Sequence, residues 1–282
     1  MQDEIFTNIK MLHLDSDQVI RTMKEQIKVC QVQPDLAWED IDANLEQLDE
    51  MLEPLEADTD LVVLPETFST GFTMRSEQCA EDVNGKVIQW MTSFASKRNC
   101  IVTGSIIFRE GEGPVYNRLF WVSPEGIEDH YDKKHLFRPG GEKENFKAGE
   151  ERKLFRLGAF RILPQICYDL RFPVFSRNRD DYDIMLYVAN WPSGRQQVWE
   201  TLTRARAMEN QAYLLGCNRV GSDGTGVASS GGTCVIDPVG NEIHRMDDRP
   251  GILTCELDLK ILKDFRKKFP AWKDADSFEP LW

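Results

Sequence analysis

The chain has 282 residues, 41% of them hydrophobic and 29% charged, which are ordinary proportions for a globular protein with its own core. Its net charge of −13 excludes the basic surface that binding to nucleic acid or to an anionic membrane requires. Because the sequence shows neither a membrane-spanning apolar run nor a secretory signal, we expect a cytoplasmic protein without nucleic-acid or membrane partners.

The cysteines argue against both disulfides and zinc. Seven are present, the number is odd, and no Cys-x-x-Cys pair or Cys/His cluster has the spacing of a metal site. We therefore expect reduced thiols and no metal or organic cofactor. Five cysteines lie in strand-like runs and are predicted to be small core residues: Cys30, Cys100, Cys217, Cys234 and Cys255.

The two ends of the chain differ from its middle. Residues 1–22 have no strand alternation and only a weak helical pattern, so we treat them as an extension. Residues 23–282 are predicted to form a single domain with a C-terminal tail. That tail carries Trp272 and Trp282, and aromatic residues in a tail usually dock on the same chain or on a second subunit.

The first half of the domain alternates strands and helices. Residues 27–33 read as a strand, and apolar residues recur three and four apart from Trp38 to Leu55, which predicts a helix. The segments that follow are predicted to be a short buried strand at 60–66, a helix at 86–98, strands at 100–110 and 115–126, and a strand running into a loop at 127–137.

The second half continues the pattern. We predict a hairpin at 153–169 that turns at Gly158, a buried strand at 183–191, a helix at 195–212, strands at 213–221, 231–241 and 251–258, and a last helix at 258–270. The inner face of helix 195–212 is expected to hold Val198, Leu202, Ala205, Met208 and Ala212. This mixture favours a layered α/β fold with sheet packed on sheet and helices outside. No G-x-G-x-x-G follows the first strand, so a dinucleotide-binding fold is not indicated.

Cys167 is the candidate nucleophile. It ends the strand in "LPQICYDLRFP" (163–173), where Asp169 and Arg171 are too polar for a core turn and indicate the edge of a pocket. A structural Asp–Arg pair that holds the turn, and a merely buried cysteine, are the alternatives. A working thiol needs a base or a cation close by.

Three residues could provide that base or cation. His135 would serve as the base of a Cys/His protease. Glu66 follows the buried strand "LVVLP", and a carboxylate that burial desolvates can act as a general base, although it could instead cap the loop. Lys133 is either a solvated charge or, beside Glu66 and a thiol, a fixed cation that holds charge developing on a substrate oxygen.

Three segments together resemble a known family. "LPETFSTGF", "YDKKHLF" and "ICYDLRFP" are similar, in this order, to the signature segments of the nitrilase superfamily of carbon–nitrogen hydrolases. The resemblance spans about residues 24–275. It implies a four-layer α-β-β-α sandwich that forms homodimers, with Trp272 and the last residues at the interface, and chemistry that needs neither metal nor cofactor.

The resemblance also implies roles. Glu66 matches the general base, Cys167 the nucleophile and Lys133 the catalytic lysine, because the family pattern is Lys-x-His-Leu and Lys134 falls on its variable position. His135 then becomes a structural residue that bonds within its own loop.

Two further site residues follow from the same match. "GEKENFKAG" resembles the segment that carries a second glutamate, which points to Glu142, with Glu144 as the weaker alternative. The backbone N–H of Tyr168 would join Lys133 in holding the oxyanion.

Four further segments resemble one branch of this superfamily. "CYDLRFPVFSRN", "DYDIMLYVANWP", "ARAMENQAYLLGCNRVG" and "KFPAWKDAD" are similar to the bacterial omega-amidases, which hydrolyse the terminal amide of α-keto acid amides such as α-ketoglutaramate and α-ketosuccinamate. Such substrates carry a carboxylate, so we expect a cationic anchor, either Arg171 or Arg195. Further candidates for the substrate pocket are Asn190, Trp191, Phe68 and Phe72.

The alternatives concern the substrate and the activity itself. The same catalytic residues would serve another amide, such as an N-carbamoyl amino acid or deaminated glutathione. A catalytically silent scaffold is the non-enzyme alternative, and the presence of Glu66, Lys133 and Cys167 argues against it.

Overall fold

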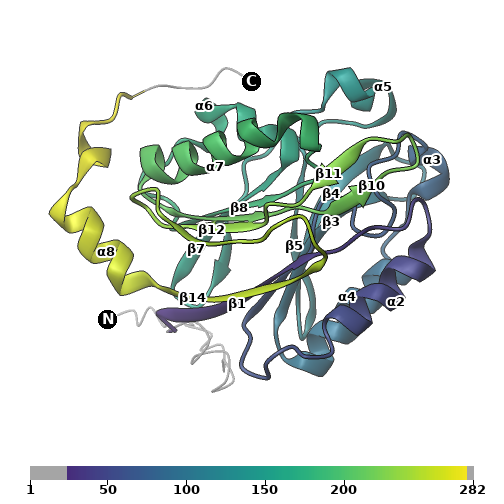
Figure 1. Cartoon of the computed structure of the whole chain (residues 1–282), viewed down its shortest axis with the longest axis horizontal. Coiled ribbons are helices and arrows are strands. Elements are labelled where there is room, and N and C mark those ends of the chain that lie inside the picture. The colour runs from purple at the N-terminus through teal and green to yellow at the C-terminus, as the bar shows by residue number, and fades with distance from the viewer. Residues whose placement is uncertain (1–23, 278–282) are drawn as a thin grey trace, which may run out of the picture.

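A computed structural model describes residues 24–277, so the predicted extension at 1–22 and the last five residues lie outside the described part. Two six-stranded sheets form the centre of the molecule. Helices cover their outer faces, α2 and α4 on one side and α7 on the other (Figure 1). The predicted four-layer α-β-β-α sandwich is therefore confirmed.

Each sheet combines parallel and antiparallel strands. The first has the order β14-β1-β2-β3-β4-β5, with β1 (Gln26–Gln33), β2 (Leu61–Val63), β3 (Ile101–Arg109), β4 (Val115–Ser123), β5 (Gly126–Asp132) and β14 (Gly251–Asp258). The second has the order β13-β12-β9-β8-β7-β6, with β6 (Phe155–Leu157), β7 (Phe160–Ile166), β8 (Ile184–Val188), β9 (Tyr213–Cys217), β12 (Cys234–Ile236) and β13 (Glu242–Arg245). The predicted hairpin turns at Gly158, as β6 pairs antiparallel with β7.

The parallel strands decide where the site forms. β1, β2 and β3 are parallel in the first sheet, and β7, β8 and β9 are parallel in the second. β5 pairs with β4, which pairs antiparallel with β3, so β5 runs in the same direction as β2. Because strands that run in one direction end at one edge, the segments after β2 and β5 leave the first sheet together, as those after β7 and β8 leave the second.

The main core lies between the two sheets. Apolar side chains of β1, β2 and β14 meet those of β7, β8 and β9 there, and a second cluster fills the space between the first sheet and its helices. All five cysteines predicted to be core residues are buried, and all seven thiols are free. Burial of this kind is the main stabilising contribution to such a layered fold.

Helix α2 (Ile41–Met51) is shorter than the predicted 38–55. The Asp40 side chain accepts a hydrogen bond from the Ala43 backbone N–H at 3.0 Å and caps the first turn. A cap at this position fixes the start of the helix. Trp38 therefore lies outside the helix, and it lines the substrate-sized pocket described below. Helix α4 (Lys86–Arg98) matches its prediction.

The predicted inner face of α7 (Gln196–Asn210) is correct only in part. Val198 and Leu202 are partly buried against the core, and Ala212, just after the helix, is buried. The buried side chains are Trp199, Thr203, Arg206, Ala207 and Asn210, whereas Met208 is 51% exposed. Periodicity of apolar residues missed part of this face because several of its members are polar. Arg206 donates to the Leu170 backbone carbonyl at 2.8 Å, so α7 buries polar groups in order to hold the turn after Cys167.

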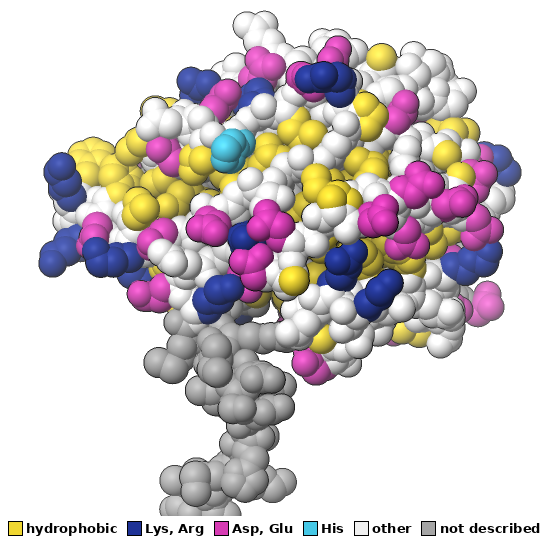
Figure 2. All heavy atoms as spheres, turned by 60° about the horizontal axis from the view of Figure 1, so that its bottom comes forward, with side chains coloured by type: hydrophobic (Ala, Val, Ile, Leu, Met, Phe, Trp, Pro, Cys, Tyr) yellow, Lys and Arg dark blue, Asp and Glu magenta, His cyan; other side chains and the backbone are white. Residues whose placement is uncertain are grey.

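The remaining elements are short or lie at the margins. They are α3 (Ser76–Cys79), α5 (Glu142–Asn145), α6 (Pro173–Ser176), the small hairpin of β10 (Val220–Ser222) and β11 (Ala228–Ser230), and α8 (Leu259–Lys268). Within residues 24–277, no helix has the length and apolar character needed to cross a bilayer. Figure 2 shows one face of the molecule, where Asp and Glu side chains gather in clusters with Lys and Arg scattered among them.

Candidate active site

Three of the predicted site residues follow strand ends at the shared edge. Glu66 comes three residues after β2, Lys133 directly after β5, and Cys167 directly after β7. The first two belong to one sheet and the third to the other. The sandwich therefore brings together side chains that lie far apart in the sequence.

Lys133 is at the centre of a buried cluster of charges. Its Nζ lies 2.7 Å from Glu66 Oε1, and 2.9 and 2.8 Å from the two carboxylate oxygens of Glu142. The side chains of all three residues have no exposed surface. The structure thus places Glu142, rather than Glu144, against Lys133. A buried cation needs such partners, because an unpaired charge in a protein interior is very costly.

Burial and charge compete within this cluster. Burial would lower the pKa of Lys133, but the carboxylates of Glu142 and Glu66 outweigh it and raise that pKa, so the ammonium stays charged at neutral pH. Burial also raises the pKa of Glu142, and Lys133 opposes this rise. The cluster holds a permanent cation between two carboxyl groups.

Hydrogen bonds hold the Glu66 carboxylate from two further directions. Asn117 donates to Oε1 at 2.9 Å, and the backbone N–H of Asn190 donates to Oε2 at 2.8 Å. The Asn190 side chain also bonds the Glu66 carbonyl and, at 3.1 Å, Thr67 Oγ1. Asn190 was predicted as a pocket residue, and it lines the pocket as well.

Asn117 is a site residue that the sequence pattern does not reveal. It lies on β4 with 1% exposure, and it donates to both Glu66 and, at 3.4 Å, Glu142. The signal was an amide side chain within the apolar run "VYNRLFWV", at a position that a buried strand would normally fill with an apolar residue.

Cys167 begins the 3-10 turn Cys167–Arg171 with a backbone φ of 45°, which is in the left-handed region. A non-glycine residue there is strained and persists only where its surroundings fix it. Burial raises the pKa of the Cys167 thiol, and the charge of Glu66 and a hydrogen bond with it raise that pKa further, against the lowering effect of Lys133. The resting group is therefore a thiol, with the Glu66 carboxylate beside it.

His135 takes a structural position, although not the predicted one. Its Nδ1 lies 2.7 Å from Asp169 Oδ1, and its ring stacks on Phe172 with centroids 3.9 Å apart. It is therefore bonded to the turn Cys167–Arg171 and not within its own loop. Because His135 does not line the pocket that contains Cys167, the protease alternative loses its base. The alternative Asp169–Arg171 pair is also absent from residues 24–277, since Asp169 bonds His135, Tyr131 and two backbone N–H groups.

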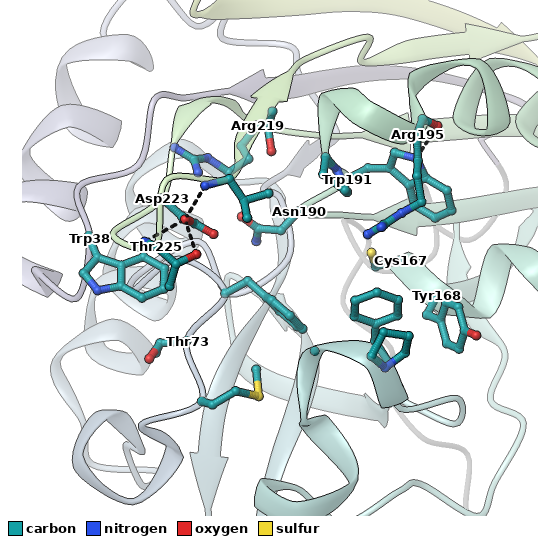
Figure 3. A pocket seen from close by; sticks show the side chains of 18 of the residues that line it. Trp38, Thr73, Cys167, Tyr168, Asn190, Trp191, Arg195, Arg219, Asp223 and Thr225 are labelled. Carbon is teal, nitrogen blue, oxygen red and sulfur yellow. Dashed lines mark hydrogen bonds between the residues drawn. The ribbon is translucent and has the colours of Figure 1, made fainter.

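A pocket of about 660 Å³ opens beside the thiol. Cys167, Tyr168, Trp191 and Arg195 lie together at one end, and Trp38, Asp223 and Thr225 lie at the other (Figure 3). The predicted Trp191 and Phe72 line this pocket. The predicted Phe68 does not, because it has no exposed surface and packs in the core between the first sheet and α4, out of reach of a substrate.

The cations of the pocket differ in their partners. Arg75 pairs with Glu39, and Arg219 pairs with Asp35 at 3.1 Å. Arg171 lies 5.6 Å over the Trp191 ring and Arg195 lies 5.0 Å over the Phe137 ring. Within residues 24–277 neither of these last two guanidinium groups forms an ion pair. In the same part of the chain, no group of three or more His, Cys, Asp or Glu is placed to hold a metal ion.

Comparison with known proteins places the chain in a family. Residues 26–267 match the family model described as carbon-nitrogen hydrolase. The chain is 45% identical over 259 residues to omega-amidase YafV of Escherichia coli (strain K12). This match covers 91% of this chain and 99% of that protein. It is 31% identical over 248 residues to 2-oxoglutaramate amidase of Bacillus subtilis (strain 168), with 86% and 95% covered.

Solved structures agree with this match. XC1258 from Xanthomonas campestris, a CN-hydrolase superfamily protein with an arsenic adduct in its active site, superposes with a TM-score of 0.88 at 40% sequence identity. The match covers 91% of this chain and all of that one. Nit3 of Saccharomyces cerevisiae, a member of the nitrilase superfamily, superposes with a TM-score of 0.79 at 27% identity, covering 89% and 96%.

Replacing Lys133 by Met should destabilise the fold. The variant leaves the carboxyl groups of Glu66 and Glu142 buried without their cation, and we expect the free energy of unfolding at pH 7 to fall by about 3–5 kcal/mol. Urea denaturation measures this loss. Because burial raises the pKa of Glu142, the folded variant takes up a proton more readily than the unfolded chain, so the loss should shrink as the pH is lowered from 7 to 5.

The matched control is the double variant Lys133→Met/Glu142→Gln. It removes one of the two uncompensated charges, so it should be more stable than Lys133→Met alone. A double variant that is no more stable would show that charge compensation is not what Lys133 contributes.

Proposed function

The chain belongs to the carbon–nitrogen hydrolase family, and we propose that it is an omega-amidase that hydrolyses the terminal amide of small α-keto acid amides such as α-ketoglutaramate and α-ketosuccinamate. Its 45% identity to omega-amidase YafV over nearly the whole length supports this substrate class, as does its similarity to 2-oxoglutaramate amidase. The observation that carries the proposal is the buried Glu66–Lys133–Glu142 cluster beside the Cys167 thiol. The pocket that Cys167 lines also holds Arg171 and Arg195, which pair with no carboxylate of residues 24–277.

The first half of the reaction forms a thioester. Glu66 takes the proton of the Cys167 thiol as the sulfur attacks the amide carbon. The oxygen of that carbonyl becomes an oxyanion, which the Lys133 ammonium and the backbone N–H of Tyr168 stabilise. When the tetrahedral intermediate collapses, the C–N bond breaks and Glu66 returns its proton to the leaving nitrogen, so ammonia departs.

The second half restores the enzyme. Glu66 takes a proton from a water molecule, which attacks the thioester carbon through the same oxyanion site. The C–S bond then breaks, the acid product leaves, and the thiol recovers its proton from Glu66. Glu142 keeps Lys133 in place through both halves, since it contacts Nζ with both carboxylate oxygens and also accepts from the Phe137 backbone N–H.

The substrate carboxylate needs a cation in the same pocket. Arg171 and Arg195 suit this task, because both line the pocket and neither is engaged by a carboxylate within residues 24–277. Each guanidinium lies over an aromatic ring, which orients it without satisfying its N–H donors. The ring of Trp191 and the amide of Asn190 complete the wall beside the thiol.

We also propose a homodimer and a cytoplasmic location. Val174 of α6 and Met208 of α7 are 52% and 51% exposed on the helix layer beside the nucleophile turn, and Phe269 is 61% exposed near Trp272. Apolar groups in such positions suit a self-complementary contact. Sedimentation at micromolar concentration should show a dimer, and a monomer would remove this part of the proposal. Seven free thiols suit a reducing compartment.

Ammonia release from α-ketoglutaramate tests the activity. Wild-type protein should release ammonia rapidly, and Cys167→Ala should lower kcat/KM by at least about 10⁴-fold, because the thioester can no longer form. An N-carbamoyl amino acid, deaminated glutathione and glutamine serve as comparison substrates.

The outcomes separate the alternatives. Turnover of a comparison substrate without turnover of the keto-acid amide would keep the catalytic residues and discard the substrate. A folded protein that turns over none of these compounds would favour the catalytically silent scaffold.

Arg171→Met and Arg195→Met test the carboxylate anchor. A charge-assisted hydrogen bond contributes about 1.5–3 kcal/mol, so loss of the anchor should raise KM for α-ketoglutaramate by about 10- to 100-fold with little change in kcat. Methionine keeps an apolar stem against the aromatic ring. Arg75→Met is the control, since that guanidinium is already paired with Glu39. Wild-type KM values in both test variants would contradict the assignment.

A further inference from the structure

One buried carboxylate connects the turn of the nucleophile with the loop of the lysine. Asp169 lies two residues after Cys167 and has no exposed surface. Its Oδ2 accepts from the Ile166 backbone N–H at 2.9 Å and from the Tyr131 hydroxyl at 2.8 Å. Its Oδ1 accepts from the His135 backbone N–H at 2.9 Å and lies 2.7 Å from His135 Nδ1, which is a donor in the tautomer that suits a carboxylate.

These four partners come from both sides of the reaction centre. Ile166 directly precedes Cys167 at the end of β7, in the second sheet. Tyr131 and His135 flank Lys133 at the end of β5, in the first sheet. The carboxylate is therefore a direct polar connection between the chain that carries the thiol and the chain that carries the ammonium.

The partners themselves are held firmly. The His135 ring stacks on Phe172 and meets Phe175 edge-on, with centroids 5.4 Å apart. Tyr131 is 1% exposed and accepts from the Lys134 backbone N–H at 3.3 Å. Because each donor is fixed by its own contacts, the position of the carboxylate between them is fixed too.

Cys167 needs this kind of support. Its φ of 45° is a conformation that a non-glycine residue leaves when its surroundings loosen. The hydrogen bond from the Ile166 N–H to Asp169 closes the turn around Cys167, and it thereby sets the direction of both the thiol and the next backbone N–H, that of Tyr168.

We propose that Asp169 is a positioning residue that holds the Cys167 thiol and the Tyr168 N–H in register with Glu66 and Lys133. This inference rests on the proposed amide hydrolysis, because the register matters only if these groups act on one carbonyl. Asp169 touches neither substrate nor the reacting atoms. It acts on the rate of the chemical step and leaves binding of the substrate carboxylate, at Arg171 or Arg195, unaffected.

The test compares two buried carboxylates. Asp169→Asn replaces an acceptor oxygen by an NH₂ group, which faces N–H or O–H donors whichever way the amide turns. We expect kcat for α-ketoglutaramate to fall about 100-fold, as for a small misplacement of reacting groups, with KM within about threefold of wild type.

Asp183→Asn is the matched control. Asp183 is also buried, and its carboxylate also accepts four hydrogen bonds, three from Arg161 and one from Arg266, but it precedes β8 at the opposite end of the sheet. We expect this variant to lower the melting temperature and to keep the wild-type kcat. Equal losses of kcat in both variants would overturn the proposal, because they would reflect general destabilisation.

A second readout does not depend on the substrate. The rate at which acrylamide alkylates Cys167 can be followed by peptide mass spectrometry. This rate measures how well Glu66 is placed to take the proton of the thiol. It should fall about tenfold or more in Asp169→Asn and stay unchanged in Asp183→Asn. Alkylation of Asp169→Asn at the wild-type rate would overturn the proposal. If wild type is alkylated but does not hydrolyse the keto-acid amide, the substrate assignment fails and this comparison still decides the role of Asp169.

Tyr131→Phe gives a milder variant in case Asp169→Asn does not fold. It removes one donor to Oδ2 and keeps the carboxylate and the ring. A fall in kcat of several-fold with unchanged KM would support positioning through Asp169. A folded Tyr131→Phe with the wild-type kcat and the wild-type rate of alkylation would contradict it.

Discussion

The site depends on a single ammonium group that has no contact with solvent. Lys133 Nζ lies within 2.9 Å of three carboxylate oxygens, and neither it nor its partners has exposed side-chain surface. Removing such charges from water is costly, so the arrangement is stable only if the ends of β2 and β5 and the helix α5 meet with good geometry. The same geometry fixes a cation close enough to the Cys167 thiol to act on its pKa.

Each sheet carries a different part of the site. The first provides the general-base candidate and the cation, and the second provides the thiol on a turn with a left-handed residue at its head. Their relative position therefore decides whether the groups can act together. Polar contacts cross between the layers at this edge, from Asn190 to Glu66 and from Asp169 to His135. Apolar packing alone would hold the sheets together, but it is not directional, whereas these bonds fix distances to tenths of an ångström.

The pocket holds both the thiol and two guanidinium groups. The Cys167 thiol lines the pocket, and the guanidinium groups of Arg171 and Arg195 lie over aromatic rings in its wall. The thiol stays protonated at rest, because burial and the charge of Glu66 raise its pKa. A thiol is less reactive than a thiolate toward stray electrophiles, so this arrangement reserves reactivity for a bound carbonyl next to the base.

The order of strands and helices and the three matching segments predict the layered fold, and they point to Glu66, Lys133, Glu142 and Cys167, because strand alternation is local and the segments keep their residue types and order. The structure brings the first three of these side chains into contact, with the Cys167 thiol beside them. The sequence by itself did not determine which polar residues are buried. The sequence does not reveal Asn117 or the buried polar residues of α7, because a polar side chain is buried only when a partner from another segment satisfies it. Contacts between distant segments also decide that Phe68 lies in the core and not in the pocket, and that His135 bonds Asp169. Only the tertiary structure brings the carboxylate of Asp169 to that histidine across the two sheets, and hydrogen bonding between distant segments leaves no periodic trace in the sequence.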